Sequence, residues 1–140
     1  MAPGDLPADE GNLVWKAVRS LGLEDRSPLE ITLEKQIPSG AGLGGGSSDA
    51  AAVIAALGDR FDIDTAQRAA AALRTGADVT FFAIGGTGRM EGIGERITRL
   101  DPLAGFVVAI VVPEYRLSTQ EVYGAWDRLE FPTGDVVDSR

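Results

Sequence analysis

A glycine-rich stretch that runs directly into an alanine-rich one constrains this 140-residue chain more than any other feature. It reads Ile37-Pro38-Ser39-Gly40-Ala41-Gly42-Leu43-Gly44-Gly45-Gly46-Ser47-Ser48-Asp49, and Ala50-Ala51-Ala52-Val53-Ile54-Ala55-Ala56 follows. Apolar and polar residues alternate from Leu29 to Leu33, which predicts a half-buried strand before the glycines. The stretch therefore lies where a strand leads into a helix N-terminus. A flexible linker is disfavoured, because linkers do not lead straight into a run of helix-forming residues.

Such a junction predicts a phosphate-binding site. Free backbone N–H groups in a first helical turn and the positive end of the helix dipole favour anions, and glycines let phosphate oxygens approach the main chain. The hydroxyls of Ser47 and Ser48 can bond phosphate or a magnesium-bound water. A Walker loop is excluded because no lysine follows Gly46. A dinucleotide fingerprint is excluded because no acidic residue ends a second strand about 20 residues later.

Composition narrows the class of partner. A net charge of −8 and the absence of a basic run argue against nucleic acid or an anionic membrane as the partner and favour a small molecule. The chain has no cysteine and no histidine, so disulfides and thiolate metal sites are excluded. Acid–base chemistry must use carboxylates, lysine or tyrosine. No apolar run approaches the roughly 18 residues of a spanning helix, so we expect a cytoplasmic protein.

Three motifs carry a resemblance to a known family. The segment Pro38 to Ala52 resembles the ATP loop of the GHMP kinases, the superfamily of galactokinase, homoserine kinase and mevalonate kinase. Gly76-Ala77-Asp78-Val79-Thr80-Phe81-Phe82 resembles G-A-D-V-P-F-F, and Gly92-Ile93-Gly94-Glu95 resembles G-[IV]-G-E, of the branch that phosphorylates 4-diphosphocytidyl-2-C-methyl-D-erythritol. The resemblance implies an α+β fold: residues 1–101 in an N-terminal lobe related to the second domain of ribosomal protein S5, and residues 102–140 opening a ferredoxin-like C-terminal lobe.

The implied reaction is transfer of a phosphoryl group from ATP, with Mg²⁺, to the 2-hydroxyl of that small-molecule substrate. The resemblance assigns substrate contacts to Ile93 and Tyr123 and implies no metal ligand from the protein. It assigns ATP binding to Asn12, Lys35, Pro38, Gly40, Ala41, Gly42, Leu43, Gly44, Gly45, Gly46, Ser47 and Ser48. Residue type alone leaves plainer alternatives open: a helix N-cap for Asn12, a solvated charge for Lys35, a hairpin turn for Ile93 and a core position for Tyr123.

Asp78 is the catalytic residue that the resemblance implies, as the base that takes the proton of the attacking hydroxyl. Taken alone, it reads as the N-cap of a short helix. Thr80 stands where the family has a proline. The family also has a lysine-bearing N-terminal strand and a third glycine-rich motif that this chain lacks, so we expect a fragment or truncated product that is inactive alone. The alternatives are a kinase for another alcohol, such as homoserine or a mevalonate derivative, and a non-catalytic nucleotide-binding remnant. The sequence predicts no oligomeric state.

Periodicity predicts the remaining elements. The segment Phe106 to Val112 reads as a strand of the type buried on both faces, although it and Leu29 to Leu33 would find few partners within this chain. The predicted helices and hairpin are Asn12 to Leu21 ended by Gly22, Ala50 to Leu57, Ala66 to Arg74 capped by Asp64 or Thr65, a hairpin from Gly85 to Leu100, and a helix from Ser118 or Thr119 to Leu129.

Overall fold

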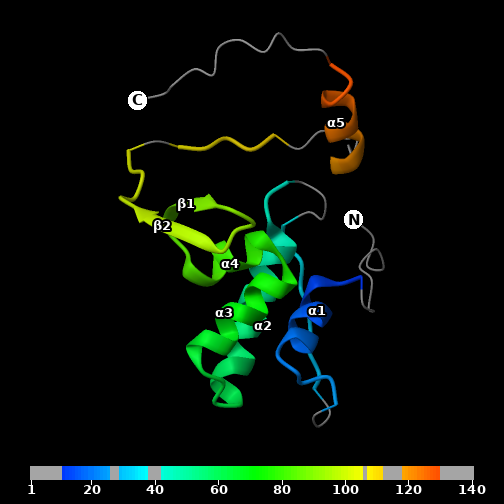
Figure 1. Cartoon of the computed structure of the whole chain (residues 1–140), viewed down its shortest axis with the longest axis vertical. Helices are drawn as coiled ribbons and strands as arrows, with labels where there is room; N and C mark the ends of the chain where they lie inside the picture. Colours follow the sequence, from blue (N-terminus) through cyan, green and yellow to red (C-terminus); the bar gives the residue numbers. More distant parts are fainter. Residues whose placement is uncertain (1–10, 26–28, 38–41, 106, 112–117, 130–140) are drawn as a thin grey trace. The chain divides into compact units, whose positions relative to one another are not determined.

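A computed structural model describes residues 11–25, 29–37, 42–105, 107–111 and 118–129. Within these ranges it contains five helices and one two-stranded antiparallel sheet, so the α+β class is confirmed (Figure 1). The chain divides into two compact units, residues 1–110 and 111–140, and each is described by itself. The lobe boundary expected at Asp101 remains a prediction.

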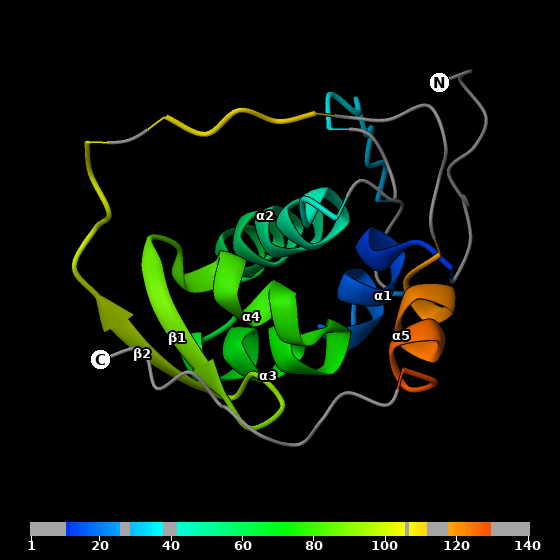
Figure 2. The same ribbon diagram turned by 90° about the horizontal axis from the view of Figure 1, so that it is seen from above.

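The first unit contains four helices that pack together. They are α1 (Leu13–Ser20), α2 (Gly45–Arg60), α3 (Thr65–Thr75) and α4 (Ala77–Ile84), and α2 and α3 each pack against all three of the others (Figures 1 and 2). Small side chains dominate the core, which lets helix backbones approach closely and bury their apolar faces. The core cluster consists of Ala17, Ala50, Ala51, Ile54, Ala71, Ala72 and Val79.

The ends of α1 and α3 are bonded to each other. Arg74 donates from its guanidinium to the carbonyl of Ser20 at 2.7 Å, and Lys16 donates from Nζ to the carbonyl of Thr75 at 2.8 Å. The buried hydroxyl of Thr75 donates to the Ala71 carbonyl at 2.8 Å and lies 3.2 Å from the Ser20 hydroxyl. Since the last carbonyls of a helix have no partner inside it, each helix supplies cations or hydroxyls that satisfy the other.

Predicted helix starts are confirmed at α1 and α3. Asn12 is the N-cap of α1, with Oδ1 accepting from the Val14 amide at 3.0 Å, and Asp64 caps α3 by accepting from the Gln67 amide at 2.8 Å. These caps form because a short polar side chain can reach a free N–H of the first turn. At the other end of α1, Gly22 has a φ of 68° and ends the helix as predicted.

Two helix boundaries differ from prediction. Helix α2 begins at Gly45 and continues to Arg60, so it is longer at both ends than the predicted helix from Ala50 to Leu57. Asp78 is not an N-cap: Gly76 holds that position and Asp78 lies in the first turn of α4. Gly76 takes an extended backbone that breaks the chain between α3 and α4, so the next helix starts immediately after it.

The hairpin is confirmed. Strand β1 (Thr87–Glu91) pairs with β2 (Arg96–Leu100), with Thr87 opposite Leu100 and Glu91 opposite Arg96. Gly92 and Gly94 turn the chain between them with φ values of 70° and 98°, a region that favours glycine.

The two other predicted strands are wrong as strands. Residues 29–36 and 107–111 are not assigned to strands, and neither segment pairs with a described strand. Val107 is 97% exposed and Val111 87% exposed, so this face is not buried. An extended segment becomes a strand only when another strand satisfies its N–H and C=O groups, and the described residues offer none here. Phe106 and Val112 lie outside the described residues.

The second unit contains α5 (Thr119–Trp126), which ends before the predicted Leu129. Ser118 caps it as predicted, and Glu121 completes a capping box by accepting from the Ser118 amide. Among the residues described, no helix has the length and apolar character needed to cross a membrane.

Candidate functional site

The N-terminus of α2 presents free backbone donors. Gly44 is the N-cap, with a left-handed φ of 67° and no side chain that caps the helix. The first bond of the helix runs from the Ser48 amide to the Gly44 carbonyl at 2.9 Å. No residue in the described part of the chain accepts a hydrogen bond from the amides of Gly45, Gly46 or Ser47. Unpaired donors at the positive end of the α2 dipole form a site suited to an anion.

Close packing requires glycine at the start of α2. A Cβ at Gly44 would lie 2.7 Å from Cε2 of Phe82, on α4, and one at Gly45 would lie 3.0 Å from Cγ2 of Ile37. The loop is therefore held between the segment before it and α4. A Cβ at Gly46 would lie 3.5 Å from Cδ1 of Leu13, which is an ordinary contact distance. The start of α1 therefore lies next to the start of α2. Neither Phe82 nor Ile37 was among the predicted site residues.

Lys35 is held beside this helix start. Its ammonium forms an ion pair with Asp49 of α2 and lies 3.5 Å from where a Cβ of Gly45 would stand. The side chain of Lys35 is only 14% exposed, so the alternative of a freely solvated charge is wrong. Asp49 fixes this lysine at the start of α2. The ammonium, paired with the Asp49 carboxylate, therefore lies next to Gly45.

The two serines of the loop have different bonding. Ser48 donates from its hydroxyl to the Gly45 carbonyl at 2.9 Å, so this side chain serves the first turn of α2. The Ser47 hydroxyl has no hydrogen-bond partner among the described residues and remains available to a ligand. Of the two hydroxyls predicted to bind phosphate, Ser47 is the better placed.

Helix α4 connects Asp78 to the loop. Asp78 and Phe82 are four residues apart, so they share one face of α4, and the ring of Phe82 contacts Gly44. Asp78 therefore lies about 6 Å along the helix axis from the residue that touches the loop. It is exposed, and its charge is favourable in the first turn of α4. The four-residue spacing of Asp78 and Phe82 could have predicted that they share a helix face.

The hairpin turn contacts the same end of α4. Gly94 is buried, and a Cβ there would lie 2.9 Å from Cβ of Ala77, the residue before Asp78. Ile93, in the same turn, is 75% exposed and free to meet a ligand. The Glu95 carboxylate accepts from the Ile93 amide at 2.6 Å, and the backbone N–H groups of Glu95 and Ile93 hold the pKa of Glu95 below its ordinary value. A hydrogen bond within the turn therefore stabilises its conformation.

The remaining predicted residues are placed as follows. Asn12 caps α1, and the next residue, Leu13, lies next to Gly46 of the loop; ATP binding by Asn12 stays a prediction. Gly42 has a φ of 72° and open space around it, and Leu43 is 39% exposed. Tyr123 is 67% exposed on α5 of the second unit, so the core alternative is wrong. Outside the described residues lie Pro38, Gly40 and Ala41.

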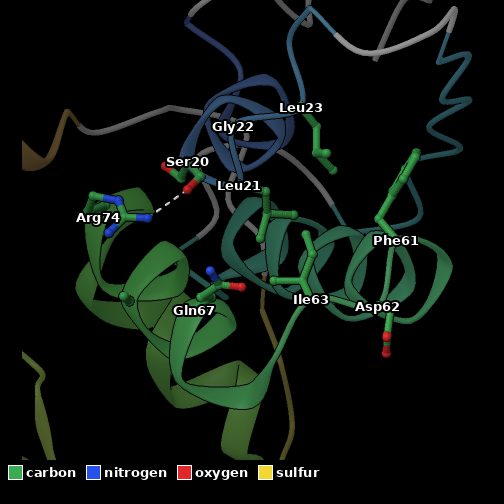
Figure 3. Close-up of a pocket in the computed structure, with 10 residues that line it drawn as sticks. Ser20, Leu21, Gly22, Leu23, Phe61, Asp62, Ile63, Gln67 and Arg74 are labelled. Atoms are coloured by element: carbon green, nitrogen blue, oxygen red, sulfur yellow. Dashed lines mark hydrogen bonds between the residues drawn. The ribbon is translucent and has the colours of Figure 1, made fainter.

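A pocket of about 380 Å³ lies elsewhere, where the end of α1 meets α3 and the connection before it (Figure 3). Arg74 reaches across it to the Ser20 carbonyl, and Leu21, Ile63 and Gln67 line it. No predicted site residue lines this pocket. Within the described ranges no three histidine, cysteine, aspartate or glutamate side chains gather to hold a metal ion.

Comparisons with known proteins agree on one family. Residues 12–86 match the GHMP kinases N terminal domain. A 4-diphosphocytidyl-2-C-methyl-D-erythritol kinase of Clostridium botulinum (strain Eklund 17B / Type B) is 41% identical over 126 residues, which are 87% of this chain and 45% of the relative. Kinases of the same name from Thermosipho africanus (43% identical over 79% of this chain, 40% of the relative) and Solidesulfovibrio magneticus (44% over 88%, 43% of the relative) are also similar. The chain spans less than half the length of these relatives.

Proposed function

This chain belongs to the GHMP kinase family, and we propose that it contributes the ATP-binding part of an enzyme that phosphorylates the 2-hydroxyl of 4-diphosphocytidyl-2-C-methyl-D-erythritol. The observation that supports this most is the start of α2, where three backbone amides without a described acceptor lie beside the Lys35 ammonium. That arrangement suits the phosphates of a nucleotide. The relatives that carry the kinase name support the choice of acceptor.

ATP would bind with its phosphates at the amides of Gly45, Gly46 and Ser47, and with the Ser47 hydroxyl as a further donor. Lys35 would add a positive charge, and Asn12 lies at the start of α1, beside the loop. Preorganised donors of this kind stabilise the charge of a transferring phosphoryl group. Mg²⁺ would be held by the phosphates of ATP, and the Ser47 hydroxyl, which has no partner among the described residues, would be available to one of its waters.

Asp78 would act as the base. It is exposed in the first turn of α4 and lies on the helix face that touches the glycine loop through Phe82. Its carboxylate would accept the proton of the acceptor hydroxyl as that oxygen attacks the γ-phosphorus. Ile93, exposed in the turn that packs on Ala77, would contact the acceptor, and we also propose Tyr123 as a substrate contact.

Nucleotide binding tests the first half of the proposal. Titrating the chain with Mg-ATP in a calorimeter should show binding, and Gly45→Val should abolish it, because the new side chain would collide with Ile37 and block the amides. Gly22→Ala is the control: Gly22 has a positive φ of 68° and open space, and it lies at the far end of α1. Equal affinity of the Gly45→Val and control variants would overturn the site.

Turnover tests the second half. Residues of this chain would replace the matching 126 residues of the Clostridium botulinum relative, and product would be followed by mass spectrometry with the cytidyl alcohol, homoserine and mevalonate as acceptors. We expect phosphorylation of the cytidyl alcohol, and a loss of about 10² to 10⁴ in rate with Asp78→Asn. Preference for another acceptor would replace the proposed substrate. Binding of ATP without transfer to any acceptor would support the non-catalytic alternative.

A further inference from the structure

The hairpin of β1, β2 and their connecting turn contacts α4 at three points. At the N-terminal end, the Gly94 backbone lies against Ala77. In the middle, a Cβ at Gly88 of β1 would be 3.5 Å from the ring of Phe81. At the C-terminal end, Arg99 of β2 donates from its guanidinium to the Ile84 carbonyl at 2.9 Å. Helix α4 is short, eight residues, so it depends on such contacts for its position.

The contact at Gly94 is the tightest of these. The nearest atoms to a Cβ at this position would be Cβ of Ala77 at 2.9 Å, Cα of Ala77 at 3.1 Å and Cε of Met90 at 3.2 Å. Two of the three belong to the first residue of α4, which cannot move without moving Asp78. Gly94 also has a φ of 98°, which a residue with a side chain rarely adopts. An added methyl group therefore has to displace either the turn or the start of the helix.

Helical geometry separates the two sides of α4. Ala77 and Phe81, four residues apart, both face the hairpin, whereas Asp78 and Phe82 share the face that reaches the glycine loop. A shift of the hairpin at Gly94 is thus transmitted through Ala77 to a carboxylate that does not itself touch the hairpin. We propose that Gly94 is a positioning residue for Asp78: its lack of a side chain lets the hairpin turn seat on Ala77 and fixes the first turn of α4. The inference rests on the proposed function only in taking Asp78 as the base.

Nuclear magnetic resonance on the full chain tests this without measuring turnover. The variant Gly94→Ala should move the carboxyl carbon resonance of Asp78 and speed amide exchange at Val79 and Thr80 by roughly tenfold, since a methyl group at positive φ adds strain at this contact. Gly86→Ala is the matched control, because Gly86 also has a positive φ, of 81°, but nothing within 4 Å. It should leave the Asp78 resonance in place.

A rescue variant separates positioning from general damage. Gly94→Ala combined with Ala77→Gly removes the nearest colliding atom, so the Asp78 resonance and the exchange rates should return toward those of Ala77→Gly alone. If Gly94→Ala alone disrupts the pairing of β1 with β2, the double variant should restore both this pairing and the Asp78 resonance. An unmoved resonance in Gly94→Ala, an equal shift in the Gly86 control, or a double variant that is not rescued would each overturn the proposal. Calorimetry with Mg-ATP on the same samples tests the proposed function separately.

Discussion

The helices of the first unit and its unpaired extended segments both contain many apolar residues, but only the helices bury them. Residues in α1 to α4 bury a cluster with Ala17, Ala50 and Val79 wholly inside, whereas Val107, in the extended segment after the hairpin, is almost fully exposed. Both regions are rich in apolar residues. The difference is that a helix satisfies its backbone within itself and needs only a neighbour for one face, whereas a strand needs a neighbour for its backbone as well.

The hairpin supports this explanation. It is also made of extended chain, yet it pairs because the turn at Gly92 to Glu95 brings its two strands together within a few residues. Segments 29–36 and 107–111 have no such local partner. Among the residues that the structure describes, extended chain forms a sheet where a short turn joins the two strands. Substitutions in the two regions test this difference.

The largest effect should come from one substitution made in both regions. Val79→Ala removes two methyl groups from a fully buried side chain in α4 and should lower the free energy of unfolding by about 2 to 3 kcal/mol. Val107→Ala, at a side chain that is 97% exposed, should change it by less than about 0.5 kcal/mol. Urea unfolding followed by circular dichroism measures both. Equal losses would mean that segment 107–111 is packed, and that the contrast is wrong.

A smaller loss of stability is expected from removing the buried hydrogen bonds of Thr75, at the ends of α1 and α3. Thr75→Val keeps the shape of a buried side chain but removes the hydroxyl that bonds Ala71 and approaches Ser20. The free energy of unfolding should fall by about 1 to 2 kcal/mol, because buried acceptors lose their donor. The measurement is again urea unfolding, with Thr98→Val at an exposed position of β2 as the control. No loss at Thr75 would show that the bonds between α1 and α3 contribute little.

The sequence predicted what depends on neighbours along the chain. Caps such as Asn12, Asp64 and Ser118 were found because a polar side chain before a helical pattern bonds the next turn. The hairpin was found from its glycines. The alternation in 29–33 predicted a strand that did not form, because period-two alternation describes a strand's faces and does not supply a partner; the shortage of partners was expected from the N-terminal strand that the family has and this chain lacks.

The candidate site shows the same limit. The glycine loop and Asp78 were predicted from motifs, and their linkage through Phe82 follows from helical spacing. The packing of Gly94 on Ala77 and the ion pair between Lys35 and Asp49 were not predicted, because each joins residues more than a helical turn apart in sequence. Such contacts depend on the packed structure and leave no local pattern.

A small gain in stability is expected at Thr80, the counterpart of Thr75 in α4. Its hydroxyl is buried and has no hydrogen-bond partner among the described residues. Thr80→Val should therefore raise the free energy of unfolding by roughly 1 kcal/mol, since an unsatisfied buried group is removed and the shape is kept. Urea unfolding of this variant and of Thr75→Val should give changes in the free energy of unfolding that have opposite signs. A loss at Thr80 would mean that its hydroxyl has a partner.

The smallest expected effect is a pH dependence of the hydrogen bond within the hairpin turn. The Glu95 carboxylate accepts from its own amide and from that of Ile93, and these bonds lower the pKa of Glu95 below 4.5. A depressed carboxylate pKa stabilises the turn above the ordinary pKa, and the stabilisation is lost as the pH falls through the folded value. The protection of the Ile93 amide, measured by nuclear magnetic resonance relative to its intrinsic exchange rate at each pH, should therefore fall as the pH is lowered through the depressed pKa of Glu95. Glu95→Gln, which cannot titrate, should remove this dependence, whereas an unchanged pH profile in that variant would assign it to another carboxylate.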